Sequence, residues 1–475
     1  MSGEAPSALL VLLLLGTTAV WRLYERSWLS PGVLLGLLWV AILGLDVVVV
    51  RYALPVEGLT FLVLSVSLFG LGALFASPGT DTRAPLPVPG PPPLDHRTTD
   101  TMRLGARRYS RLAIVFGALG MLEPLDLLRT AGYSPSSILK LQNLLSLASG
   151  YTHDRYAVAG YREPAIATLG AAFIFAAALF GGSSFAMRFD DGRAHDTWAW
   201  RARSAGSFLV FVPSVLATLF LTTRTVFVLT AILWISSYMA MSVLVRARGQ
   251  GRERKSRHVM RAARVLVAVA AVVGITATAF VIRDGIAGVG RSEVDSELAS
   301  SLLGAPSAFA ESFPEQGSKL WSSQGLGTRT LYGPVGLVFH VPKPYFPSIP
   351  IGVGTDLQDE TTNRTVFGDL IHDYSAPGAL LLLFVGGYGA EVAFRKTKGG
   401  SGWALASLAG ANAAILASVA MFPFTFTTVE VGWLLFAACS ARTFVTPKRH
   451  HTARASVAGT TAPRGRRLEP IDMGS

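Results

Sequence analysis

The stretch TTNRTVFGDLIHDYSAPGALLLLFVGGYG (361–389) changes from polar to apolar near its middle. An apolar run begins at Ala376, and four charged or polar aromatic residues come shortly before it: Asp369, His372, Asp373 and Tyr374. Charged groups beside a hydrocarbon segment are costly unless they face water or a partner. The stretch therefore predicts a polar loop that ends where a membrane-spanning helix begins.

Similar apolar runs recur along the whole chain. Of the 475 residues, 51% are hydrophobic and only 15% are charged, whereas a soluble protein carries about 25% charged residues. The runs are long enough to cross a hydrocarbon layer of about 30 Å as helices. We therefore predict an all-α polytopic membrane protein with about 11 transmembrane helices. The predicted spans are 7–21, 31–50, 57–76, 111–128, 165–187, 205–221, 223–245, 265–282, 376–394, 402–421 and 429–445.

The basic residues orient these spans. With the N-terminus outside and the C-terminus in the cytoplasm, most of the 42 Lys and Arg residues fall in inner segments, as the positive-inside rule requires. The net charge of +12 is thus explained by topology, and we expect no nucleic-acid partner. The transmembrane domain spans 1–445, the Pro-rich inner segment 77–108 is expected to be an extended linker, and the basic tail 446–475 is expected to be disordered.

Two long outer loops remain, 129–164 and 283–375, and the second joins spans 8 and 9. A loop of that length in a compact membrane protein is uncommon unless it carries function. Arginines gather on this outer face: Arg155, Arg162, Arg224, Arg283, Arg291, Arg329 and Arg364. A guanidinium binds phosphate through two parallel hydrogen bonds. The set predicts an anion site, although a single arginine such as Arg224 can also extend to the membrane surface as an anchor.

The acidic residues next to the ninth span allow two interpretations. On a helix, Asp369 and Asp373 are four residues apart and share a face with His372, so one of these groups could serve as a general base. Alternatively, the carboxylates only favour the positive end of a helix dipole. Other acidic residues at outer span ends are expected to be solvated: Asp46, Glu57, Glu123 and Glu430. No metal-ligand spacing occurs in the outer loops, so we expect no metal and no cofactor.

Three stretches resemble a known family. TTRTVFVLTAILW (222–234) resembles a polar turn with an arginine that opens a span, and LLGAPSAFAES (302–312) resembles the start of a large outer loop. VFGDLIHDYSAPGALLLLFVGGYG (366–389) resembles the exit of that loop. In this order they resemble the bacterial oligosaccharide repeat-unit polymerases of the O-antigen polymerase type, which are related to the O-antigen ligase superfamily. Many members have an arginine where this chain has Gly368, so Arg364 or Arg329 would take its role.

The resemblance implies a glycosyltransferase of the bacterial inner membrane that joins polyprenyl-diphosphate-linked oligosaccharide repeat units at the outer face. It implies a catalytic set of Arg224, His372, Asp373 and Asp369. It also implies a substrate-binding set of Arg155, Arg162, Arg283, Arg329, Arg364 and Tyr374. The expected partners are the lipid-linked substrate, membrane lipids, and the flippase and chain-length regulator of the same pathway.

Three other functions stay open. An O-antigen ligase shares the arrangement of spans and one large outer loop. A lipid-linked-oligosaccharide flippase or transporter needs charged residues deep in several spans, whereas the charged residues here gather at one face. A membrane scaffold for envelope assembly would explain the loops but not the set of arginines.

Overall fold

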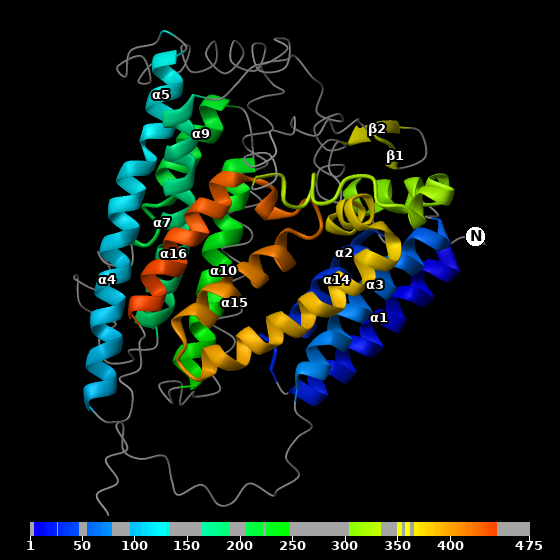
Figure 1. The fold of residues 1–475 in the computed structure, drawn as a ribbon, viewed down its shortest axis with the longest axis horizontal. Coiled ribbons are helices and arrows are strands. Elements are labelled where there is room, and N and C mark those ends of the chain that lie inside the picture. The colour runs from blue at the N-terminus through cyan, green and yellow to red at the C-terminus, as the bar shows by residue number, and fades with distance from the viewer. Residues whose placement is uncertain are drawn as a thin grey trace, which may run out of the picture.

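The structure is a computed structural model that describes, apart from a few single positions, residues 4–25, 27–46, 55–77, 96–130, 164–189, 206–221, 225–247, 304–333, 349–353, 357–361 and 365–443. Helices dominate this part of the chain (Figure 1). Their bounds are α1 (Glu4–Glu25), α2 (Pro31–Leu45), α3 (Val56–Ala76), α4 (His96–Gly120), α5 (Leu122–Thr130), α7 (Ala165–Phe189), α9 (Phe211–Leu221), α10 (Thr225–Ala247), α14 (Val366–Lys398), α15 (Gly402–Ala417) and α16 (Thr427–Thr443).

Shorter elements lie between α10 and α14. A helix covers 304–312 and is followed by the 3-10 helix η3 (Pro314–Trp321). Strands β1 (Ile349–Val353) and β2 (Leu357–Thr361) pair antiparallel, with Ile349 opposite Thr361. A second 3-10 helix, η4 (Pro423–Thr425), precedes α16. The large predicted outer loop therefore contains secondary structure of its own.

Within the described residues, five helices are long and apolar enough to cross a membrane: Pro6–Glu25, Val56–Ala76, Ala165–Met187, Thr225–Ala247 and Val366–Lys398. Helices α2 and α15 are apolar but shorter. The prediction of a helical membrane protein is confirmed at this level, while the number of eleven spans stays a prediction. Described helices overlap each predicted span except 265–282, which lies outside the described residues.

Two predictions for the fourth span and the linker before it need correction. The predicted span 111–128 is divided at Met121 between α4 and α5. Helix α4 begins at His96, so the linker predicted over 77–108 is not extended in its last part. The prolines of that linker end at Pro93. Because proline is what prevents a continuous helix, the chain can become helical once the prolines end.

Two groups of helices meet along α15. Helices α1, α2, α3 and α14 pack together on one side, and α4, α7, α10 and α16 pack on the other (Figure 1). The first group buries Trp39, Leu62 and Phe367, and the second buries Tyr109 and Phe180. Helix α15 contacts members of both groups, namely α2, α14, α10 and α16. The space between the groups is therefore bordered by helices from both.

Close backbone contact fixes α14 against α3. A Cβ atom on Gly72 would overlap the carbonyl oxygen of Phe384, and one on Gly387 would overlap the carbonyl oxygen of Phe69. Small residues allow membrane helices to approach in this way. At the far end of α14, Arg395 Nε donates to Glu391 Oε1 over 2.9 Å, as their spacing of four residues predicts.

Helix α14 is broken near its start. Ser375 has φ 65° and ψ 167°, a conformation that is rare for a residue with a side chain. Pro377 follows and cannot donate a hydrogen bond to the preceding turn. The helix therefore consists of a short first part, 366–374, and a longer apolar second part that begins at Ala376. The break falls where the sequence changes from polar to apolar.

Candidate functional site

The short first part of α14 carries the polar residues of the opening stretch. Thr365 is the N-cap, and its Oγ1 accepts a hydrogen bond from the Gly368 amide over 3.3 Å. The ring of Phe367 packs 5.0 Å from that of Trp39 on α2, centroid to centroid. The cap of α14 is thus Thr365, and neither Asp369 nor Asp373 occupies that position. The two carboxylates do not cap their own helix, so they can bind groups from other segments.

Asp373 is fully buried and accepts hydrogen bonds from a distant segment. Its Oδ2 accepts from the amides of Arg329 (3.0 Å) and Thr330 (2.8 Å) and from Thr330 Oγ1 (2.8 Å). Its Oδ1 accepts from Thr328 Oγ1 over 3.3 Å and contacts His372 Nδ1 at 3.2 Å. Hydrogen bonds donated to a carboxylate favour its ionised form. Asp373 therefore organises the chain around it as a buried anion.

We call residues 323–333 the crossing segment, because they link the break in α14 to the chain before α16. Ser323 Oγ donates to the Asp373 carbonyl over 2.5 Å, and the Gln324 amide donates to the His372 carbonyl over 2.9 Å. On the other side, Thr425 Oγ1 donates to the Arg329 carbonyl over 2.7 Å. The segment is therefore fixed to both α14 and η4.

His372 is oriented by its neighbour. Its side chain is 23% exposed, and Nδ1 faces the buried carboxylate of Asp373. In a neutral ring, donation of the Nδ1 proton to this carboxylate would leave Nε2 as the acceptor. The arrangement resembles the way in which a carboxylate fixes the tautomer of a catalytic histidine. The sequence allowed either Asp369 or Asp373 as the partner of His372, and the structure has Asp373 in contact with Nδ1.

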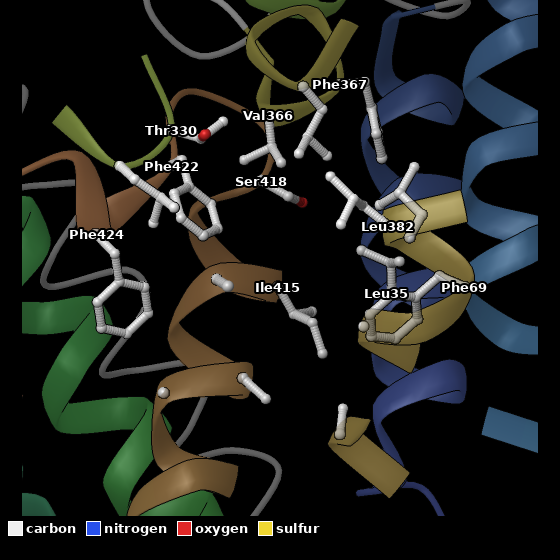
Figure 2. A pocket seen from close by; sticks show the side chains of 18 of the residues that line it. Leu35, Phe69, Thr330, Val366, Phe367, Leu382, Ile415, Ser418, Phe422 and Phe424 are labelled. Atoms are coloured by element: carbon white, nitrogen blue, oxygen red, sulfur yellow. The ribbon is translucent and has the colours of Figure 1, made fainter. Parts of the chain in front are cut away.

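An apolar cavity of about 720 Å³ opens beside this cluster. Figure 2 shows Thr330, Val366 and Phe422 at one end, and Leu35, Phe69 and Ile415 further along. The walls come from α2, α3, α14, α15 and α16 and are almost entirely hydrocarbon. The polar exceptions are Thr330, Tyr374, Ser407, Ser418 and Glu430. Thr330 Oγ1 and the Tyr374 hydroxyl lie 3.2 Å apart, so they connect the cavity to the Asp373 cluster.

The structure brings five of the sequence-predicted residues together: Arg329, Asp369, His372, Asp373 and Tyr374. Asp369 is buried one helical turn before Asp373. Arg329 is half-buried and supplies its main-chain amide to Asp373. The other predicted arginines lie outside the described residues, and they are Arg155, Arg162, Arg224, Arg283, Arg291 and Arg364.

Several acidic residues are not the solvated charges that the sequence suggested. Asp46 is buried and accepts a hydrogen bond from Ser307 Oγ over 3.1 Å, and Glu123 is buried as well. Glu430 lines the cavity, while Glu57 is exposed as expected. Hydropathy assigns such residues to span ends, but it cannot indicate which of them other elements cover.

Sequence analysis missed the residues that bind Asp373. Thr328 and Thr330 flank Arg329 in GLGTRT (325–330), and no motif marks them as partners of a carboxylate more than forty residues later. The amides of Arg329 and Thr330 carry no sequence signal, because every non-proline residue has one. Gly327 is a glycine of the kind that favours a turn, and in the structure it has φ 88°.

The site thus combines a partly exposed histidine, a buried carboxylate and an apolar cavity. In the described part of the chain, no group of three or more His, Cys, Asp or Glu residues is placed to hold a metal ion. Comparison with protein-family models, with curated proteins and with solved structures gives no match. A functional assignment must therefore rest on the chemistry of these residues.

Proposed function

We propose that the protein is a membrane glycosyltransferase that polymerises polyprenyl-diphosphate-linked oligosaccharide repeat units at the outer face of the bacterial inner membrane. One observation supports this most directly. The apolar cavity ends at a polar cluster that contains His372, Asp373 and Tyr374. A lipid-linked glycan has the same division, with a hydrocarbon chain on one side and a diphosphate and sugars on the other.

In this proposal the cavity holds part of the polyprenyl chain. Its walls offer side chains such as Leu35, Phe69 and Ile415, and burial of hydrocarbon against them is favourable. The cavity borders the second part of α14, which is apolar. The diphosphate would then lie level with the break in α14, where the arginines of the outer loops are expected.

The proposed reaction forms one glycosidic bond. The hydroxyl oxygen of the incoming unit attacks the anomeric carbon of the growing chain, and the bond to the polyprenyl diphosphate breaks with its electron pair leaving on the diphosphate. His372 Nε2 takes the hydroxyl proton. Asp373 holds the imidazole and the crossing segment in place. Arg329, together with Arg224, Arg155, Arg162, Arg283 and Arg364, stabilises the charge that develops on the diphosphate.

Several parts of this proposal rest on the sequence alone. The protein would cross the membrane several times, with its N-terminus outside and its C-terminus in the cytoplasm. It would receive substrate from a flippase and act with a chain-length regulator. An O-antigen ligase that transfers finished glycan to a lipid core would use similar chemistry. The polymerase and the ligase therefore differ in the molecule that receives the glycan.

Loss of the protein from its host distinguishes the polymerase from its alternatives. In a deletion strain we expect surface glycan with one repeat unit on its acceptor and no ladder of longer products, because transfer of one unit needs no polymerisation. Gel electrophoresis of the extracted glycan measures this, and re-expression of the wild-type chain is the control. If no unit reaches the acceptor, a ligase or flippase function replaces the proposed one.

The orientation can be tested with single cysteines in a Cys439→Ser background. Ser322 is exposed at the end of η3, in the predicted large outer loop. A cysteine there should react with a membrane-impermeant thiol reagent in intact cells. A cysteine at Ser256, in the predicted inner loop, should react only after the membrane is opened. The reverse pattern of labelling would place the site on the cytoplasmic side.

A further inference from the structure

Glu430 lies in the first turn of α16 and lines the apolar cavity. Its carboxylate rests on the end of the crossing segment, because a Cβ atom on Gly333 would overlap Glu430 Oε2. Among the cavity-lining residues that the structure describes, Glu430 is the only one with an acidic or basic side chain. It faces the same space as Thr330 and Tyr374.

No N–H or O–H of the described residues donates a hydrogen bond to the Glu430 carboxylate. This differs from Asp373, whose two oxygens already accept several hydrogen bonds from the crossing segment. A polar group in an apolar wall is costly unless a partner supplies the hydrogen bonds. Glu430 therefore has two acceptor oxygens available for a ligand that donates.

Aromatic side chains line the same cavity as this carboxylate. Phe424 and Trp433 both line the cavity, and their rings meet edge to face with centroids 5.9 Å apart. The indole is fixed because Trp433 Nε1 donates to the Ala406 carbonyl over 2.8 Å. A sugar ring matches such a surface, since its hydroxyl groups donate hydrogen bonds while its C–H faces pack on aromatic rings.

We propose that Glu430 binds the sugar that supplies the attacking hydroxyl, by accepting hydrogen bonds from other hydroxyl groups of the same ring. This inference rests on the proposed glycosyltransferase function. It identifies the part of the site that binds the sugar whose hydroxyl group attacks. The ligand group at Glu430 is a hydroxyl and not the diphosphate, because the oxygens of a carboxyl group accept hydrogen bonds from hydroxyl groups, whereas a diphosphate has only accepting oxygens. The acceptor sugar would then lie between the aromatic wall and the crossing segment, whose Thr330 binds the Asp373 that contacts His372.

The test separates binding of the acceptor from chemistry. The donor is lipid-linked oligosaccharide extracted from cells that lack this protein, and the acceptor is the same oligosaccharide, released by mild acid and labelled at its reducing end. Purified Glu430→Gln protein in liposomes should show a KM for the labelled acceptor sugar raised about tenfold or more, because one of the two hydrogen-bond-accepting oxygens is replaced by an NH₂ donor. Its kcat should change much less than that.

Two further variants keep the test independent of folding. Gly333→Ala retains Glu430 but displaces its carboxylate, so it should raise the same KM. Glu57→Gln removes an exposed carboxylate at the start of α3 and should leave the KM unchanged. An unchanged KM in Glu430→Gln, or a fall in kcat alone, would overturn the assignment. If the wild-type protein forms no product from the donor, the proposed function fails instead, so the two failures are distinguishable.

Discussion

His372→Gln should reduce polymer formation by about 10² to 10⁴-fold, the usual cost of losing a general base. Glutamine keeps part of the hydrogen-bonding capacity of the imidazole, but it cannot take up the hydroxyl proton. The side chain is partly exposed, and glutamine can also donate a hydrogen bond to Asp373, so we expect the variant to fold. The measurement is the rate of polymer formation by purified protein in liposomes, with extracted lipid-linked oligosaccharide as substrate.

Substrate binding should largely survive in His372→Gln. In the proposed site the polyprenyl chain lies against the apolar walls of the cavity, which His372 does not line. Photo-crosslinking to a labelled lipid-linked unit should therefore reach the wild-type level. His450→Gln, in the basic tail, is the matched control and should have no effect on either measurement. Normal polymer formation by His372→Gln would show that another group accepts the proton.

The long helices are the part of this fold that the sequence predicts well. Helices α3, α7 and α10 begin and end close to the predicted spans, because the length of an apolar run is a local property that bilayer thickness constrains. The break in α14 also has local signals, since Pro377 and Gly378 follow the polar residues. The number of spans stays a prediction, and α4 and α5 show how an apolar run can mislead it. One apolar run is divided there at Met121.

The contacts that build the site are long-range and have no local signal. Asp373 binds the amides of Arg329 and Thr330, and those amides are chemically the same in any sequence. The cavity is formed by side chains from five helices, so it depends on how α14 and α15 pack and not on any one motif. The cavity position of Glu430 could therefore not be predicted, because in the sequence Glu430 resembles the exposed Glu57.

Asp373→Asn should cause the largest combined loss of polymer formation and local structure. Asparagine has only one accepting oxygen. Its NH₂ group would take the place of either Oδ1 or Oδ2, and in both positions it would face N–H or O–H donors. The donors include the Arg329 and Thr330 amides, at 3.0 and 2.8 Å from Oδ2. A buried donor without a partner costs about 1–3 kcal/mol. The crossing segment should therefore detach from α14 in part of the molecules.

Two measurements separate this anchoring role from direct proton transfer. If Asp373 anchors the crossing segment, Asp373→Asn should increase tryptic cleavage after Arg329 and also reduce polymer formation, whereas His372→Gln should reduce polymer formation only. Asp126→Asn is the matched control. Asp126 Oδ2 accepts one amide hydrogen bond, from Ala167 over 3.1 Å, and asparagine can still accept it. Unchanged cleavage together with normal polymer formation in Asp373→Asn would mean that the buried charge neither fixes the crossing segment nor supports His372.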